Sequence, residues 1–252
     1  MKNFGLRLKK LSGVLIMMIA GYSAMFAQKG ENEIIRTNID ADGQKIVLTA
    51  IAGNEHNYPM MAAWLEDMDG NFLQTIYVNE SVAKGYFRYA SESEGKWQPG
   101  EAVRPASLPV WAHSRGIPSG EGHFMPTKNN PVPDAYTSAT PKSDFTVYGR
   151  ADQKISGKVN VFFEINQSWD WNEYWTNSKY PDNDDYKTSS QPSVVYSAII
   201  DFDDPEEDYV LKPVGHGHYS GDDGKIYPDL STLTTALDII EKVTVSVQPD
   251  DR

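Results

Sequence analysis

The stretch "KVNVFFEINQ" (Lys158–Gln167) decides the fold class of this chain. Its apolar residues Val159, Val161, Phe163 and Ile165 alternate with residues that are mostly polar or charged. Successive side chains of a β-strand point to opposite faces of the sheet. The alternation therefore predicts a strand with one apolar, buried face.

Seven further stretches read as strands, because Val, Ile, Tyr, Phe and Thr recur in them between turn residues. They are Lys45–Ala52, Met60–Asp67, Phe72–Val78, Asp144–Gly149, Ser193–Phe202, Asp208–Gly215 and Lys242–Gln248. Eight strands with turn-rich gaps predict an all-β protein built as a β-sandwich.

Two connections carry local signals. Asp69-Gly70 predicts a type I′ turn, which would join the second and third of these seven strands as a hairpin. The segment Asp229–Lys242 predicts one short helix before the last strand, with Ser231 or Asp229 as its cap.

Two long segments do not fit short connections. Residues 91–133 form an insertion rich in Gly, Pro, Ser and charge, and insertions of this length are usually functional or disordered. Residues 168–192 form an extension rich in aromatic residues. We expect residues 28–252, with both of these segments included, to be a single domain.

The first 27 residues predict a secretory signal peptide, because positive residues precede a short apolar run. We expect the mature chain to begin near Gln28, without membrane insertion, in the periplasm or outside the cell. The chain has no cysteine and a net charge of −12, and loss of the four positive residues in 1–27 leaves −16. This charge argues against nucleic acid and anionic lipid as partners.

The aromatic extension supplies candidate ligand-binding residues: Trp169, Trp171, Tyr174 and Trp175. Such rings give a large contact area at low entropy cost and could stack on sugar rings or hold a partner. The alternative, which we favour, is that they fold back over the domain as a lid.

His216 and His218 are weak candidates for metal binding. In a strand both would point to one face, as a metal pair would, but no third ligand follows at a defined spacing. We expect accessible histidines and no tight zinc site.

Two stretches carry a family resemblance. "AAWLEDMDGNFLQTIYV" and "DAYTSATPKSDFTVYGRADQKISGKVNVFFEI" are similar to signatures of an exported bacterial family, domain of unknown function 2271. That family is related to the immunoglobulin-like module of flagellar hook-capping proteins. The resemblance spans roughly residues 45–167 and implies an immunoglobulin-like β-sandwich, but no settled activity.

The stretch "PDAYTSATPK" also resembles a site at which a transferase attaches FMN to threonine. The resemblance would make Thr140 the acceptor, with Asp134 and Thr137 as motif residues. This chain has Ser138 where that motif has glycine, and Asp and Thr also shape ordinary turns. We therefore predict that Thr140 is unmodified and that the protein holds no cofactor.

No nucleophile stands in a recognisable catalytic motif: the chain lacks cysteine and a Gly-x-Ser-x-Gly elbow. We expect a non-enzymatic binding or accessory protein of the bacterial cell envelope, with another envelope protein or a small molecule as partner. The alternatives are a flavin-linked redox accessory with FMN on Thr140, and carbohydrate binding through the tryptophan-rich segment.

Overall fold

The computed structural model describes residues 31–120 and 122–248. In chain order its elements are β1 (Glu33–Arg36), β2 (Lys45–Ala52), β3 (Met60–Glu66), β4 (Phe72–Asn79), α1 (Glu80–Lys84), β5 (Tyr86–Ser93), β6 (Lys96–Glu101), α2 (Pro109–Ser114), the 3₁₀ turn η1 (Asp134–Tyr136), β7 (Thr137–Ser138), β8 (Phe145–Arg150), β9 (Lys158–Asn166), α3 (Asp184–Ser189), β10 (Val194–Asp201), β11 (Tyr209–His216), the 3₁₀ turn η2 (Thr235–Asp238) and β12 (Ile240–Gln248). No helix in the described ranges is long and apolar enough to cross a membrane.

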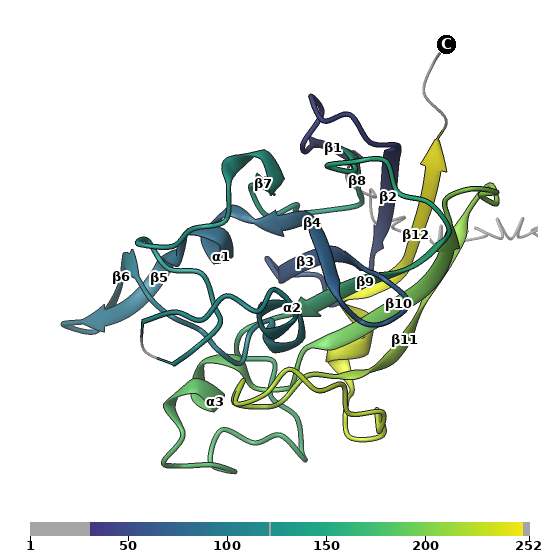
Figure 1. Ribbon diagram of the computed structural model, residues 1–252. Coiled ribbons are helices and arrows are strands. Elements are labelled where there is room, and N and C mark those ends of the chain that lie inside the picture. Colours follow the sequence, from purple (N-terminus) through teal and green to yellow (C-terminus); the bar gives the residue numbers. More distant parts are fainter. Residues whose placement is uncertain (1–30, 121, 249–252) are drawn as a thin grey trace, which may run out of the picture.

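Ten strands form one mixed sheet in the order β1-β8-β2-β12-β11-β10-β9-β3-β4-β7, and this sheet curls until it nearly closes into a barrel (Figure 1). Strand β11 makes the corner. Its residues Tyr209–Leu211 pair with β12, and the following residues pair with β10 beside a bulge at Val195/Tyr196. Because hydrogen bonding continues through β11, the strands do not divide into two facing sheets.

The predicted immunoglobulin-like β-sandwich is therefore wrong. The error has a physical cause: alternation of apolar and polar residues reports one buried face, and strands of sandwiches and of barrels both have one. The decisive information lies in which strands pair, and above all in the corner at β11, which alternation does not encode.

The seam of the barrel lies between β4 and β8, and side chains close it in place of a strand ladder. The buried Gln74 of β4 donates to the carbonyl oxygen of Arg150 (3.1 Å) and accepts from the backbone N–H of Asp152 (2.7 Å). Next to it, Asn38 N–H donates to the carbonyl of Ala135 (2.8 Å). The segment around η1 therefore bridges the two edges of the sheet.

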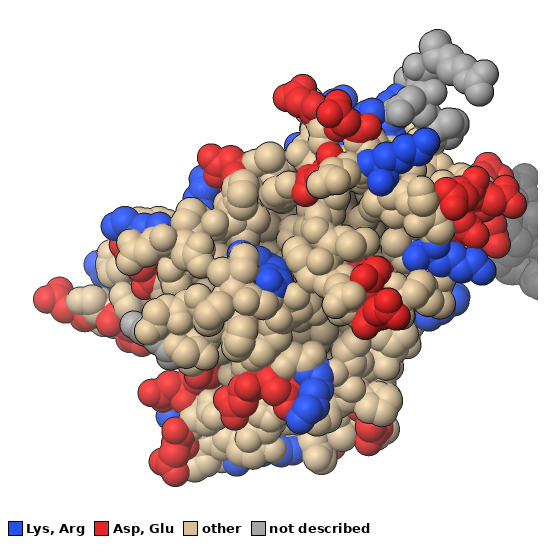
Figure 2. All heavy atoms as spheres, in the orientation of Figure 1, with Lys and Arg blue, Asp and Glu red and all other residues tan. Residues whose placement is uncertain are grey.

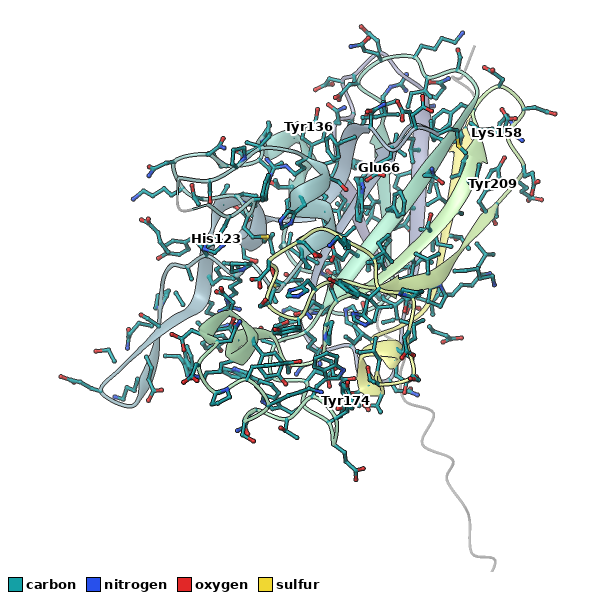
Figure 3. All side chains as sticks on the ribbon, turned by 60° about the horizontal axis from the view of Figure 1, so that its bottom comes forward. Glu66, His123, Tyr136, Lys158, Tyr174 and Tyr209 are labelled. Atoms are coloured by element: carbon teal, nitrogen blue, oxygen red, sulfur yellow. The ribbon has the colours of Figure 1, made fainter. Side chains whose placement is uncertain are left out.

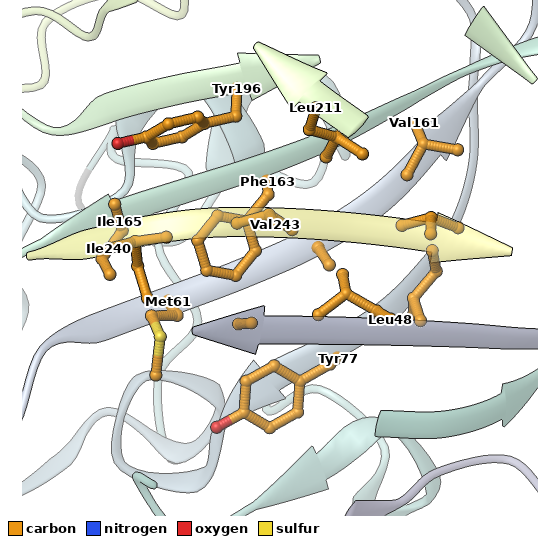
Figure 4. Packing of buried hydrophobic residues seen from close by; sticks show 14 of the residues in the cluster. Leu48, Met61, Tyr77, Val161, Phe163, Ile165, Tyr196, Leu211, Ile240 and Val243 are labelled. Atoms are coloured by element: carbon orange, nitrogen blue, oxygen red, sulfur yellow. The ribbon is translucent and has the colours of Figure 1, made fainter. Parts of the chain in front are cut away.

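The barrel interior is a continuous apolar core (Figure 4). The alternating residues of β9 predicted to be buried, Val159, Val161, Phe163 and Ile165, are each at most 2% exposed and belong to it. This part of the prediction is confirmed. Burial of each such side chain contributes about 1.5–3 kcal/mol.

A second apolar cluster covers the outer face of β3, β4 and β9. Trp64 stacks on Phe162 with ring centroids 5.1 Å apart, and the fully buried Trp111 of α2 belongs to the same cluster. Strand β3 is thus buried on both faces, which explains its unbroken apolar run "MMAAWL". The insertion 91–133, expected as a long loop, instead contains β6 and α2 and supplies much of this cover.

All eight predicted strands exist within one or two residues, but two connections differ from the prediction. In the β3–β4 hairpin only Gly70 has positive φ (+83°), whereas type I′ needs it at two positions, so the turn is of another type. The predicted C-terminal helix is only the 3₁₀ turn η2, whose N-terminus has no side-chain cap; Asp229 instead accepts from the backbone N–H of Ser231.

The two ends of the barrel are unequal. At one end short turns join β3 to β4, β8 to β9 and β10 to β11; Lys158 and Tyr209 lie there. At the other end lie the insertion, the aromatic extension and the segment 217–239, with Tyr174 at its margin (Figure 3). Chemistry-bearing side chains are concentrated at this long-loop end.

Candidate functional site

The aromatic extension packs over the long-loop end of the barrel. Trp175 (6% exposed) and Tyr186 (0%) join the interior core, and Trp171 lies edge-on to Tyr186 with centroids 5.5 Å apart. Tyr219 stacks on Tyr180 at 4.1 Å. Most of the extension is thus a lid, as the favoured reading expects, and aromatic contacts hold it in place.

Two amides fix the lid. Asn172 accepts from the backbone N–H groups of Tyr174 (2.9 Å) and Trp175 (2.7 Å) and donates to the carbonyl of Thr232 (2.9 Å). The side-chain oxygen of Gln191 accepts from the Thr234 N–H (2.8 Å) and from the Asn172 amide (3.0 Å). These bonds join the extension to the segment before β12, so the two parts form one rigid rim.

Behind this rim lies an open pocket of about 240 Å³. Its lining comes from the extension, the end of β11 and the segment after it: Tyr174, Trp175, His216, His218, Tyr219, Tyr227, Asp229 and Thr232. Four candidates that the sequence placed in separate motifs, Tyr174, Trp175, His216 and His218, therefore meet in one place.

The hydrogen-bond partners assign the two histidines opposite tautomers. His216 Nδ1 lies 2.7 Å from the carbonyl oxygen of Gly217, so Nδ1 carries a proton, and in the corresponding uncharged tautomer Nε2 is an acceptor. His218 Nδ1 accepts from the N–H groups of Ser220 and Asp222 (both 3.4 Å), so its Nε2 is a donor. Within the described residues neither Nε2 has a hydrogen-bond partner.

The rest of the pocket wall is acidic and aromatic. Hydrogen bonds from Ser231 lower the pKa of the Asp229 carboxyl, which is therefore ionised at neutral pH. Tyr227 stacks on His216 (5.5 Å, 16°) and donates its hydroxyl to Asp223 (3.0 Å). The pocket thus offers a carboxylate, a neutral acceptor, an N–H donor and ring faces.

The described residues hold no group of three or more potential metal ligands of the His, Cys, Asp or Glu type. Asp223 is engaged by Tyr227 and by Lys225, whose ammonium lies 3.1 Å from it. His216 and His218 are half-buried. The expectation that they form no tight zinc site stays a prediction.

The other two aromatic candidates lie apart from the pocket lining. Trp171 supports the lid from within, as described above. Trp169 is 53% exposed and contacts Trp97 of β6, with ring centroids 5.2 Å apart. The extension therefore presents two separate aromatic surfaces.

The segment of the flavin-like motif lies at the seam of the barrel. Thr140 is half-buried, and its hydroxyl accepts from the amide of the buried Asn79 (2.9 Å). Thr137 donates its hydroxyl to the carbonyl of Asp134 (3.1 Å), as in an ordinary turn, and Tyr136 donates to Asp152 (2.7 Å). These contacts fit a structural role; that Thr140 is unmodified stays a prediction.

Sequence reasoning missed half of the pocket: Tyr219, Tyr227, Asp229 and Thr232. Tyr219 and Tyr227 belong to the histidine-bearing stretch "GHGHYSGDDGKIYPD". Aromatic residues stand next to polar residues repeatedly in this stretch, and that pattern could have indicated a binding site. Thr232 had none, because its position depends on the Asn172 contact from a distant segment.

Comparison with known proteins gives no relative: no family model, no curated protein and no solved structure matches this chain. The fold and the pocket therefore carry the functional argument alone.

Proposed function

We propose that the protein is a non-enzymatic binding protein whose pocket holds a sugar unit. The observation that carries the proposal is the pair of opposite tautomers beside aromatic faces. A sugar hydroxyl both donates and accepts, and His216, His218 and Asp229 together offer it two acceptors and one donor.

Ring faces supply the second half of sugar recognition. The C–H groups of a pyranose pack against an aromatic face, and Tyr174 (52% exposed) at the rim and Tyr227 in the wall offer such faces. The ammonium of Lys179 lies 3.0 Å from the Tyr174 ring centroid and fixes that ring by a cation–π contact.

The arrangement favours binding over catalysis. Glycoside hydrolysis needs two carboxyl groups across the bond to be broken, and the pocket lining contains one carboxylate, Asp229. Export to the periplasm or beyond, expected from the first 27 residues, lies outside the described residues and belongs to the same proposal.

Calorimetric titration tests the proposal. Glucose, galactose, mannose and N-acetylglucosamine, with the β-linked and α-linked tetrasaccharides of glucose and N-acetylglucosamine, form the panel. We expect at least one to bind, and His216→Ala and Tyr227→Ala to weaken binding about tenfold or more. Tyr148→Ala, an exposed tyrosine on the outer face of β8, is the matched control. Absence of binding across the panel, or equal binding by all variants, would refute the proposal.

A further inference from the structure

The exposed pair Trp97 and Trp169 lies outside the pocket and has no evident stabilising role. Trp97 on the β5–β6 hairpin is 42% exposed and Trp169 is 53% exposed, yet their rings contact each other at 5.2 Å. Both segments are long insertions, and neither ring belongs to an apolar cluster. Two large rings that keep this much contact with water contribute little to folding.

The backbone holds Trp169 in an unfavourable conformation. Its φ is +64°, in the left-handed region that non-glycine residues avoid. Its N–H donates to the carbonyl of Ser189 (3.2 Å), and the carbonyl of Asp170 accepts twice from Gln191 (3.3 and 2.9 Å). Neighbouring bonds therefore enforce the strain, and enforced strain of this kind is typical of functional positions.

A half-buried guanidinium joins the two segments. Arg104 donates to the carbonyl of Tyr89 on β5 (2.5 Å) and to the hydroxyl of Ser168 (3.4 Å), and it lies 4.2 Å from the Phe87 ring centroid. Ser168 directly precedes Trp169. The hairpin and the extension are thereby fixed to each other, so the two rings form a preorganised surface.

The geometry of the pair selects its ligand. The two ring planes are inclined at 52°, so one flat molecule cannot lie on both rings. Successive sugar rings of a polysaccharide are turned relative to each other, so each tryptophan can contact a different sugar. The hairpin residues nearest Trp97 are polar or charged, with Glu92 directly opposite it. A protein partner would need about 800 Å² of contact surface, which two rings do not supply.

We propose that Trp97 and Trp169 form a second contact surface for a polysaccharide chain whose other contact is the pocket. This inference rests on the proposed function and extends it from a sugar unit to a polymer. Trp169 and Trp175 are six residues apart, so their Cα atoms are separated by at most about 22 Å. One polymer chain is long enough to reach both.

The test measures retention of the protein on cellulose, chitin, insoluble xylan and starch granules, alongside calorimetry with the soluble tetrasaccharides. We expect Trp97→Ala and Trp169→Ala to weaken polymer binding about tenfold or more while tetrasaccharide binding in the pocket persists. Tyr86→Ala is the control, because Tyr86 is 53% exposed on the same hairpin. Thermal unfolding of each variant verifies that it is folded.

The outcomes separate the two proposals. If both tryptophan variants bind polymer like the unmodified protein, the inference is wrong and the pocket proposal stands. If they lose polymer binding while no tetrasaccharide binds and His216→Ala has no effect, the tryptophan surface stands and the pocket proposal fails. If no polymer is retained, the inference is wrong whatever the tetrasaccharides do.

Discussion

The two ends of the barrel are built on different principles. At the short-loop end, tight turns such as 67–71 hold their shape by local bonds: Asp67 accepts from the backbone N–H groups of Asp69 (2.9 Å) and Asn71 (2.8 Å). At the long-loop end, shape depends on contacts between distant segments, such as those of Asn172 and Gln191.

Charged side chains occur at both ends of the molecule (Figure 2). Acidic side chains gather around the periphery in Figure 2, including the tip of the β5–β6 hairpin, and the middle of that face carries few charges. In this chain of net charge −12, the pocket at the long-loop end is lined mainly by aromatic rings and histidines, with Asp229 as its one carboxylate. The strands of the barrel thus provide the frame, and the long segments that contact one another form the site. Each prediction below measures how far the two ends differ.

The largest effect is expected at the lid. Trp175→Ala removes a 6%-exposed ring that belongs to the barrel core, so it should lower the free energy of unfolding by about 3–5 kcal/mol. Its neighbour Tyr174 is 52% exposed, and Tyr174→Ala should change the free energy of unfolding by less than about 0.5 kcal/mol. Urea denaturation measures both. Equal values for the pair would mean that the lid is not part of the core.

The next effect concerns the buried Glu164, which fixes α2 to the sheet. Its carboxylate accepts from the N–H groups of Val110 (3.2 Å) and Trp111 (2.8 Å) and from the hydroxyl of Ser193 (2.6 Å). Burial nevertheless raises its pKa to about 7, because the loss of hydration outweighs the three hydrogen bonds, which lower it.

A raised pKa means that the folded protein binds more protons than the unfolded chain between about pH 4.5 and pH 7. The free energy of unfolding should therefore fall by about 3 kcal/mol as the pH rises through this window and level off above it. Glu164→Gln should remove this slope, whereas Glu241→Gln on the exposed side of β12 should keep it. Urea denaturation at pH 5, 6, 7 and 8 checks both. An unchanged slope in Glu164→Gln would show that another group titrates.

The two ends of the barrel also differ in how well the sequence predicts them. Eight of the ten strands of the described sheet were visible, because runs such as Val159 to Ile165 are a local signal, whereas the short edge strands β1 and β7 were not predicted. The sheet order was not, since a corner such as β11 depends on pairing between remote strands. In the site, residue type revealed Trp175 and His216 as candidates. Their meeting depends on Asn172 and Thr232, which are 60 residues apart.

A smaller effect is expected at Gly217, between the two pocket histidines. A Cβ here would lie 2.5 Å from Ser193 Oγ and from Pro109 Cγ, and 3.2 Å from a carboxylate oxygen of Glu164. Gly217→Ala should therefore cost about 1–3 kcal/mol by overpacking. Gly120→Ala, in the insertion, meets nothing within 4 Å and is the control. Thermal unfolding compares them; similar midpoints would argue against this close approach.

The smallest effect belongs to the short-loop end, at Gly70. Its φ of +83° is strained for alanine, but no atom lies within 4 Å of a Cβ there, so Gly70→Ala should cost only about 1 kcal/mol. Gly70→Asn should cost less, because asparagine tolerates the left-handed region.

Asp69→Ala separates the two turn types. A type I′ turn needs positive φ at this residue too and would be destabilised, whereas the observed turn keeps Asp69 at negative φ. We therefore expect Asp69→Ala to be nearly neutral in urea denaturation, since the backbone N–H that Asp67 accepts from is retained. If Asp69→Ala lowered the free energy of unfolding as much as Gly70→Ala does, the turn would be of type I′ after all. The hairpin would then contain two residues with unfavourable positive φ, at an end of the barrel that otherwise depends on local hydrogen bonds.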